Sequence, residues 1–355
     1  MADTLENTPI PTTELSTDLT GISNGEIFTL IVMLIVSTLS LSGNLLVIGA
    51  VYMRESLRTP NNLLLLNLAI ADLGQGIIAM PLRMTEVFNR GTEPLVSCQF
   101  VLFVTILFFG GSMITVALIS IDRFIAIRWP FLYVKAVTRG AVLVATACCW
   151  SFMVILAAVP YMGAASTPTI STKFCFYSQY LSKAYLLAMF SIVNILIVVI
   201  LLFTNVYLLK ETIRHITRIK MLVAPMPSNV GSLNVPEAES AASRTSNRPS
   251  IVPSPGEGQA GQTRAGYNRF IKATRVTLVV VGFTIVLTTP IMLIDLVSIW
   301  NPNSSPPIVT RISVAMAYAN SCVNPWIFAR LNKLYRQTYI EVLKKLRSFL
   351  LCKTQ

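Results

Sequence analysis

Long apolar runs separated by short polar segments dominate this sequence. Each run holds about 20 or more mostly apolar residues, and a helix of that length, rising ~1.5 Å per residue, crosses the ~30 Å hydrocarbon core of a bilayer. The runs lack the alternating segments of roughly ten residues that mark an outer-membrane barrel. We therefore predict an all-α membrane protein with a seven-transmembrane helix bundle, whose spans cover about 27–53, 61–88, 98–127, 140–162, 183–209, 273–300 and 308–329.

Composition excludes a water-soluble enzyme. Of the 355 residues, 54% are hydrophobic and 12% are charged, whereas a soluble domain carries about 25% charged residues. The single histidine, His215, leaves little for a histidine-based metal site or triad. Residues 21–25 fit GxSxG, but they lie in a polar tail, and residues 256–261 fit GxGxxG in a loop where we expect no helix to open. We predict that both matches are chance and that the protein is not an enzyme.

The distribution of charge predicts an orientation. Residues 1–26 carry five acidic and no basic residues, and no basic region precedes an apolar core there, so we expect no cleaved signal peptide. With this end outside, 23 of the 28 Lys and Arg residues lie on the inner side, as the positive-inside rule requires. We predict a multi-pass plasma-membrane protein with an extracellular N-terminal tail (1–26) and a bundle (27–330). The net charge of +12 then faces lipid and cytosolic partners, not nucleic acid.

Two inner segments differ from the spans. Residues 219–268 are rich in Pro, Ser, Gly and Ala and cannot bury a core, so we predict that the third inner loop is disordered. In residues 331–355, apolar side chains share one face and basic side chains lie mostly elsewhere, which is typical of an amphipathic helix on a membrane surface, followed by a cytoplasmic tail. Cys352 follows this stretch and is a candidate for palmitoylation.

Polar residues inside the spans are costly in hydrocarbon and mark candidate sites. Asp72 lies near the middle of the second span, and one carboxylate among neutral oxygens could hold a partly hydrated cation or form an interhelical hydrogen-bond cluster. At the inner end of the third span, Asp122 can hold Arg123, or Arg123 can be a snorkelling anchor. The neutral polar residues near the middle of other spans are Asn44, Ser112, Asn320, Ser321 and Asn324.

Short motifs occur in order in all seven spans. From the first span to the seventh they are Gly43-Asn44, Leu68-Ala69-Ile70-Ala71-Asp72, Cys98 with Asp122-Arg123-Phe124, Trp150, Tyr207, Pro290, and the run from Asn320-Ser321 to Asn324-Pro325 and Phe328. On these motifs the sequence resembles the rhodopsin-like (class A) G-protein-coupled receptors. Each motif alone is loose, but seven in the right spans and order are specific.

The resemblance implies roles for several residues. Cys98 would pair with Cys175 in the second outer loop. Asp72 and the neutral polar residues named with it would form a sodium pocket, and no other cofactor is implied. Arg123 would be a cytosolic latch that contacts a G protein after activation, with Tyr207 supporting the freed arginine. The motif that contains Pro325 and Phe328 belongs to the same activation machinery.

The same resemblance implies partners. These are heterotrimeric G proteins, arrestins, receptor kinases, the lipid bilayer, and an extracellular small molecule or short peptide that enters the bundle.

Departures from the family pattern bear on the resting state. Thr288 stands where a tryptophan is usual, Phe328 replaces a tyrosine, and Val199 stands where a proline is common. No acidic residue near Arg269 and Lys272 precedes the sixth span to pair with Arg123. We hypothesise raised basal activity; the alternative is simple repacking by larger neighbours.

Missing residues narrow the ligand class. Thr105 replaces the aspartate of aminergic receptors and Tyr318 the lysine of opsins, so we expect neither a biogenic-amine receptor nor a retinal-binding opsin. Asp295 is either the partner of a cationic ligand group or a salt-bridge partner of Arg311. The candidate pocket residues are Thr105, Phe109, Thr288, Asp295 and Tyr318.

Two other functions stay open. A seven-span transporter or channel could use Asp72 as a relay, although no internal repeat is present and the pair at Asp122 and Arg123 has no role in that account. A non-signalling decoy receptor would keep ligand binding and lose G-protein coupling, and Thr288 and Phe328 favour it.

Overall fold

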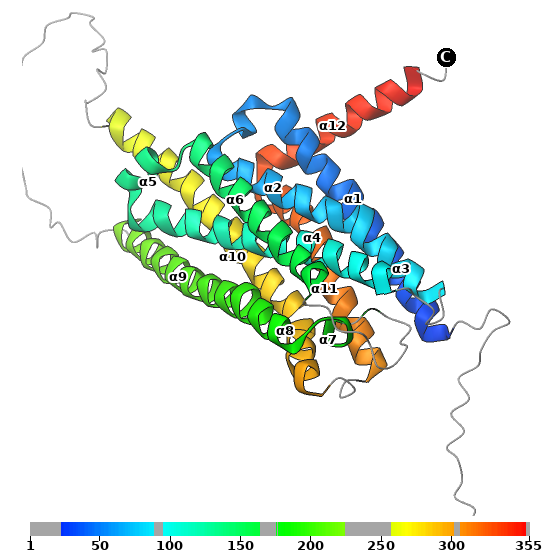
Figure 1. Cartoon of the computed structure of the whole chain (residues 1–355). Coiled ribbons are helices and arrows are strands. Elements are labelled where there is room, and N and C mark those ends of the chain that lie inside the picture. The colour runs from blue at the N-terminus through cyan, green and yellow to red at the C-terminus, as the bar shows by residue number, and fades with distance from the viewer. Residues whose placement is uncertain are drawn as a thin grey trace, which may run out of the picture.

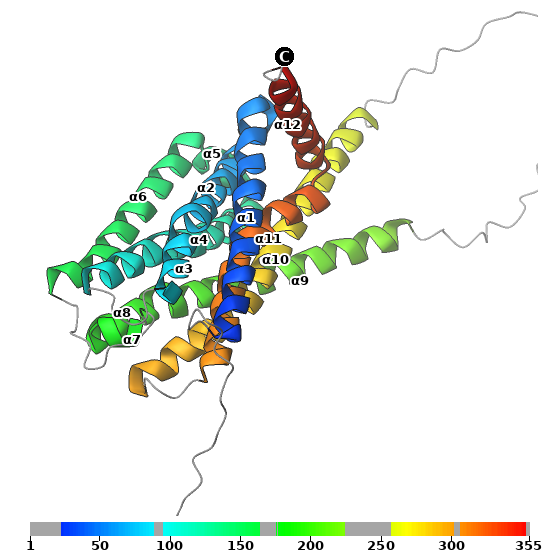
Figure 2. The same cartoon turned by 90° about the vertical axis from the view of Figure 1, so that its right-hand side faces the viewer.

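The computed structural model describes residues 23–88, 95–163, 175, 177–223, 257–301 and 306–352. All elements formed by these residues are helical, and the long helices lie side by side in one bundle (Figures 1 and 2). This confirms the predicted all-α class. Residues 1–22 of the predicted outer tail lie outside the described part of the chain.

The first four long segments are continuous or nearly continuous helices. In chain order they are α1 (Asn24–Met53), then α2 (Pro60–Gly74), the π-helical turn η2 (Gln75–Ala79) and α3 (Met80–Phe88), then α4 (Leu95–Arg128), then α6 (Arg139–Ala158) with the 3-10 turn η3 (Val159–Met162). The short helices η1 (Glu55–Leu57) and α5 (Pro130–Ala136) connect them.

The second part of the chain completes the bundle. In chain order it forms α7 (Tyr177–Tyr180), α8 (Lys183–Met189), the π-helical turn η4 (Phe190–Ile195), α9 (Leu196–Val223), α10 (Glu257–Trp300), α11 (Pro307–Leu331) and α12 (Lys333–Cys352). Helix α12 runs away from the axis of the bundle (Figure 1). Its residues Tyr335 and Tyr339 are buried, whereas Leu346, on the same predicted apolar face, is more than half exposed.

Local sequence explains several helix starts. The Ser23 hydroxyl accepts a hydrogen bond from the Glu26 backbone N–H, and the Glu26 carboxylate accepts one from the Ser23 N–H, so α1 begins with a capping box, at Asn24 and not at residue 27. The Thr59 and Thr138 hydroxyls cap α2 and α6 by accepting hydrogen bonds from the N–H groups of Asn62 and Ala141.

The predicted disorder of residues 219–268 is wrong at both ends of the loop. Helix α9 extends to Val223 and α10 begins at Glu257, while residues 224–256 lie outside the described part. The prolines of the loop all fall between 225 and 255, outside both helices, as expected for a residue that breaks a helix. A helix therefore does open beside the GxGxxG match, although the described residues before it form no strand.

The outer surface of the bundle is apolar. Leu34, Ile155, Phe203 and Val286 are each more than half exposed, although they lie in the middle of long helices. Six of the described helical segments are long and apolar enough to cross a membrane. Helix α11, the predicted seventh span, falls short of that criterion because its polar residues lower its mean hydropathy. Several of these polar side chains are buried inside the bundle: Ser313, Asn320, Ser321 and Asn324.

Gly43 allows α1 and α11 to approach closely. A Cβ atom at this position would lie 2.9 Å from Cγ of Pro325. The close contact brings the next residue, Asn44, against the backbone of α11, where its amide donates to the Ser321 carbonyl at 3.0 Å.

Candidate functional site

Asp72 is the centre of a buried polar network in the middle of the bundle. Its carboxylate accepts a hydrogen bond from the Ser112 hydroxyl at 2.7 Å and another from the Asn324 amide at 2.8 Å. The Gln75 amide donates to the same carboxylate at 3.4 Å. The network therefore joins α2, α4 and α11 around one carboxylate, and Asp72 itself is fully buried.

The remaining predicted residues of this cluster divide between two networks. Asn44 and Ser321 join the Asp72 network through the bond from Asn44 to the Ser321 carbonyl and through Ser40, whose hydroxyl donates to the Asp72 carbonyl at 3.0 Å. Asn320 instead accepts a hydrogen bond from Thr284 of α10 at 3.0 Å. Ser40 and Gln75 were not among the predicted residues; Gln75 lies one helical turn after Asp72, which is the signal that indicates it.

Two oxygens near Asp72 have no hydrogen-bond partner among the residues that the structure describes. They are Asn44 Oδ1 and Gln75 Oε1, both completely buried. Buried polar atoms are normally satisfied, so each orphan oxygen needs an occupant such as water or a cation. Among the described residues no three His, Cys, Asp or Glu side chains gather in one place, and the site offers one carboxylate with neutral oxygens. That donor set fits a monovalent hard cation better than a transition metal.

A second polar cluster closes the inner end of α4. Arg123 Nε donates to Asp122 at 2.8 Å, and both side chains are buried. Tyr133 of α5 completes the cluster: its hydroxyl donates to Asp122 at 3.1 Å and accepts from Arg123 at 3.0 Å. Burial raises the pKa of Tyr133 to about 12, so its hydroxyl keeps its proton at neutral pH. Arg123 is thus a bonded, buried cation and not a snorkelling anchor.

Sequence reasoning missed Tyr133. It lies ten residues after Arg123, beyond the end of α4, and only the turn at Trp129 and the short helix α5 bring it back. Tyr207, in contrast, is predicted to support Arg123, but its ring packs edge-on against Phe124, with the ring centroids 4.9 Å apart.

Aromatic side chains fill the junction of α11 and α12. Phe328 is almost fully buried, and its ring lies 5.8 Å from that of Tyr335. The Tyr339 hydroxyl donates to the Pro325 carbonyl at 3.5 Å. Two phenols of α12 thus lie beside Phe328 and Pro325, and the buried Tyr335 hydroxyl has no hydrogen-bond partner in the described part of the chain. Cys352 ends α12.

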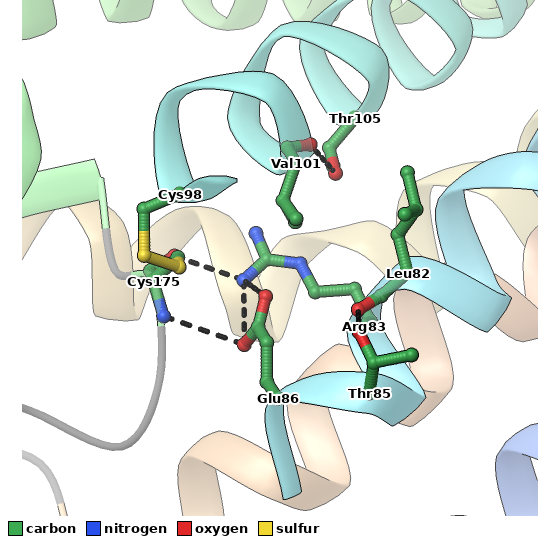
Figure 3. The surroundings of a disulfide bond; sticks show 8 residues. All are labelled: Leu82, Arg83, Thr85, Glu86, Cys98, Val101, Thr105 and Cys175. Carbon is green, nitrogen blue, oxygen red and sulfur yellow. Dashed lines mark hydrogen bonds and ion pairs between the residues drawn. A yellow bond between two sulfur atoms is a disulfide. The ribbon is translucent and has the colours of Figure 1, made fainter. Parts of the chain in front are cut away.

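A disulfide and an ion pair close the outer end of the bundle. Cys98 and Cys175 form the disulfide expected from the family resemblance (Figure 3). Arg83 donates to the Cys175 carbonyl at 2.8 Å and to Glu86 at 3.1 Å, while the Cys175 N–H donates to Glu86 at 3.3 Å. The loop is thus held to α3 by charge-assisted hydrogen bonds as well as to α4 by a covalent bond.

The alternative pairing of Asp295 with Arg311 is wrong. Arg311 forms its ion pair with Glu26 of α1 at 3.5 Å, and Asp295 has no ion pair with any described residue. Gly25 makes room for this contact, because a Cβ there would lie 2.7 Å from the Arg311 guanidinium.

A small depression lies between α7 and the outer halves of α8, η4 and α10, with a cavity volume of about 10 Å³, room for about one water molecule. Of the five predicted pocket residues only Asp295 lines it. Thr105 and Thr288 donate to backbone carbonyls of their own helices, Tyr318 is buried, and Phe109 packs on the apolar core. The lining residues are Tyr177, Leu186, Met189, Phe190, Asn194, Asp295 and Ile299.

The fold and these clusters define a receptor class. A family model described as "7 transmembrane receptor (rhodopsin family)" matches residues 43–328 of the chain. The chain therefore belongs to the rhodopsin family of seven-transmembrane receptors.

Individual relatives are more distant. The adenosine receptor A2b of Bos taurus is 21% identical over 342 residues, which cover 90% of this chain and 90% of the relative. The alpha-1A adrenergic receptor of Oryctolagus cuniculus is 23% identical over 85% of this chain and 64% of its own length. The 5-hydroxytryptamine receptor 2B of Dichotomyctere fluviatilis is 34% identical over 142 residues, which cover 39% of this chain and 30% of the relative. All are receptors, which confirms that the chain is not an enzyme.

Proposed function

We propose that this protein is a plasma-membrane receptor that binds an extracellular small molecule or short peptide within its bundle and activates heterotrimeric G proteins. The observation that carries the proposal is the inner cluster of Asp122, Arg123 and Tyr133. A charged residue buried in a membrane span is costly and usually marks a functional site, so the buried Arg123 at the cytosolic end of α4 favours a functional role. Release of Arg123 toward the cytosol supplies that role.

The proposed activation step is a change of partners at Arg123. In the resting bundle Asp122 and Tyr133 hold the guanidinium through the hydrogen bonds described above. An agonist at the outer end shifts the population toward a state in which these bonds open and Arg123 contacts the G protein. Tyr207 of α9, whose ring packs against that of Phe124, would then approach the freed arginine.

The Asp72 network is proposed to bind sodium. Asp72 would supply the charge, and Ser112, Asn324 and the orphan oxygen of Asn44 would supply neutral ligands. Bound sodium would provide a counter-charge that ties α2, α4 and α11 together and so favours the inactive bundle. Ser321 would contribute by holding Asn44 through its carbonyl; Asn320, which bonds to Thr284, would take part only indirectly.

The same contacts support the hypothesis of raised basal activity. Arg123 bonds to Asp122 and Tyr133 alone among the described residues, so no bond from this arginine reaches α10. Hydrogen bonds confined to α4 and the short helix α5 would leave α10 freer to move than a bond between α4 and α10 would. Arrestins, receptor kinases and palmitoylation at Cys352 belong to the same proposal, supported by family membership.

The test is basal activation of the major Gα classes in cells, at matched surface expression reported by an N-terminal epitope on intact cells. We expect activity above that of untransfected cells, lost in Arg123→Ala and kept in Arg128→Ala, a charge control whose side chain lies over the Trp129 ring. Labelling of the epitope without permeabilisation checks the outward N-terminus. If no Gα class is activated without ligand, the hypothesis of raised basal activity is contradicted. If no Gα class is activated with a ligand bound either, the result favours a non-signalling decoy receptor.

A further inference from the structure

The last turns of α12 carry a concentration of positive charge. Three basic residues there are exposed: Lys344, Lys345 and Arg347. The only acidic residue of the helix, Glu341, is paired with Arg54 at the end of α1, so it does not neutralise them. This end of α12 also lies away from the other helices of the bundle (Figure 1). It is therefore a basic segment that enzymes and lipids can reach.

Ser348, directly after these basic residues, is open to an enzyme. Its side chain is exposed, and its hydroxyl donates to the Lys345 carbonyl of its own helix at 2.8 Å. Thr338 of the same helix is completely buried, and its hydroxyl donates to the Leu334 carbonyl at 2.8 Å. Of the two aliphatic hydroxyls of α12, only that of Ser348 is therefore accessible.

The place of Ser348 near the end of the helix helps an enzyme to bind it. Helix α12 ends at Cys352, and the last four carbonyls of a helix have no partner within the helix, so its final turn opens at little cost. The buried side chains of Tyr335 and Tyr339 lie more than two helical turns before Ser348. Opening of this end therefore leaves their contacts intact and presents Ser348 in an extended segment.

The residues around Ser348 match what a basophilic protein kinase selects. Lys or Arg stands one, three and four residues before the hydroxyl, and the apolar Phe349 follows it. Kinases discriminate among substrates by the pattern of charge beside the target hydroxyl. Thr338 also has an arginine two residues before it, but its burial keeps it from a kinase. Exposure thus separates two hydroxyls that both have basic neighbours in the sequence.

Another face of the same turns is apolar. Leu343 and Leu346 are each at least half exposed. A helix with such a face and with basic residues beside it lies in the surface of a membrane and is attracted by anionic lipid. The attraction grows with the number of basic residues, so Lys344, Lys345 and Arg347 contribute to it. A phosphate, with a charge of about −1.5 to −2 at pH 7, would offset about two of these three charges.

We propose that Ser348 is a phosphorylation site for a basophilic protein kinase, and that its phosphate releases the end of α12 from anionic lipid at the inner face of the membrane. The inference rests on the proposed orientation, which puts α12 in the cytosol, and not on G-protein coupling. The kinase uses ATP: a bond forms between the Ser348 oxygen and the γ-phosphorus, the bond from that phosphorus to the β–γ bridging oxygen breaks, and ADP leaves. The hydroxyl proton passes to a base of the kinase.

The first test is phosphorylation of the purified full-length receptor in lipid nanodiscs. The catalytic domain of protein kinase C, which is basophilic, is compared with casein kinase 2, which is acidophilic, and mass spectrometry locates the phosphate. We expect phosphate on Ser348 with the basophilic kinase only, and none on the buried Thr338. Absence of phosphate from Ser348, equal modification of Ser348 by both kinases, or equal modification of Thr338 overturns the proposal.

Matched variants test the role of the basic residues. Lys344→Gln combined with Lys345→Gln removes two charges one helical turn before Ser348, and we expect the rate of phosphorylation of Ser348 to fall about tenfold. Lys333→Gln combined with Arg336→Gln removes two exposed charges of the same helix far from Ser348 and should leave that rate unchanged. Equal rates in the two double variants would contradict recognition through the basic residues.

Hydrogen exchange of the backbone amides of residues 343–352 tests the release from lipid. In nanodiscs that contain phosphatidylserine, we expect phosphorylation to lower the protection of these amides about tenfold or more. In phosphatidylcholine alone only the helix dipole opposes the phosphate, so the loss of protection should be about fivefold or less. Ser348→Ala, treated with the same kinase, should lose no protection.

Two results of the exchange experiment count against the proposal. Unchanged protection after phosphorylation, or equal losses in the two lipids, would show that the phosphate does not act through anionic lipid. Because these assays need neither a ligand nor a G protein, their failure would leave the proposed receptor function intact. An N-terminal epitope that is labelled only after permeabilisation would instead contradict the orientation on which both proposals rest.

Discussion

At the residue level, the inner cluster depends on a hydroxyl that no motif marks. Tyr133 bonds to both members of the pair formed by Asp122 and Arg123, so its phenol ties the short helix α5 to the end of α4. The acid and base adjacent in sequence could be predicted to pair. The third member could not, because its approach depends on how the chain turns after α4.

Removing that hydroxyl should raise basal signalling. We expect Tyr133→Phe to weaken the resting latch by about 1 kcal/mol, the net value of a typical hydrogen bond, and so to increase the active population about fivefold. The measurement is basal G-protein activation at matched surface expression. Tyr52→Phe, which removes an exposed hydroxyl at the inner end of α1, is the control. Unchanged activity in Tyr133→Phe would show that Asp122 is sufficient to hold Arg123 and that the Tyr133 hydroxyl contributes nothing.

The Asp72 network leads to a prediction about ions. Replacing external sodium by N-methylglucamine should raise basal activity about fivefold or more, because a cation bound preferentially by the inactive state stabilises that state. Asp72→Asn should abolish the dependence on sodium, since the amide removes the only charge of the site. A sodium response that survives in Asp72→Asn would place the ion elsewhere and leave the network as a purely structural cluster.

At the level of elements, close contacts between helices decide which polar residues meet. Asn44 reaches α11 because Gly43 lets Pro325 approach, and Trp150 of α6 donates to Asn67 of α2 at 2.8 Å. Asn67 in turn donates to Thr115 of α4 at 2.7 Å. These bonds join neighbouring helices in the interior of a membrane, where no water is present to bond to the same polar groups.

Adding one methyl group at the α1–α11 contact should therefore destabilise the bundle. We expect Gly43→Ala to lower the free energy of unfolding by about 1–3 kcal/mol, because the new Cβ overlaps the ring of Pro325 and the helices must move apart. Gly282→Ala is the matched control: no atom lies within 4 Å of a Cβ there, and alanine stabilises a helix by up to ~1 kcal/mol over glycine. Melting temperatures of the two purified variants should shift in opposite directions. Equal shifts in the melting temperatures of the two variants would mean that α1 and α11 move apart without a loss of stability.

At the level of the whole molecule, the bundle has polar networks inside and apolar side chains outside. The outer end is tied together twice, by the disulfide between Cys98 and Cys175 and by the ion pair of Glu26 with Arg311. Both ties join elements distant in sequence, so they hold the ring of helices around the candidate ligand pocket. The inner end is held by the Arg123 cluster and by the contact of Arg54 with Glu341 of α12.

Breaking the outer covalent tie should lower both stability and ligand binding. We expect Cys175→Ser to cost about 2–4 kcal/mol, since the bond closes a loop between residues 77 apart in sequence. Cys98→Ser should have the same effect, and the double variant should be no worse than either single one, because both changes remove one bond. Cys148→Ser, at a free and exposed cysteine, is the control. Surface expression and thermal melting report the result; additive losses in the double variant would argue against a shared bond.

The sequence by itself determined the class of fold, because the length and apolar character of each run leave a backbone in hydrocarbon little choice but a helix. Motifs in order identified the family, which predicted the disulfide and the assembly of most of the Asp72 cluster. Tertiary structure alone decided that Tyr133 bonds to both Asp122 and Arg123, and that Arg311 pairs with Glu26. The physical reason is the same in each case. Periodicity along one helix says which residues face inward, whereas the partner they meet depends on the packing of two or three helices and on the turns between them.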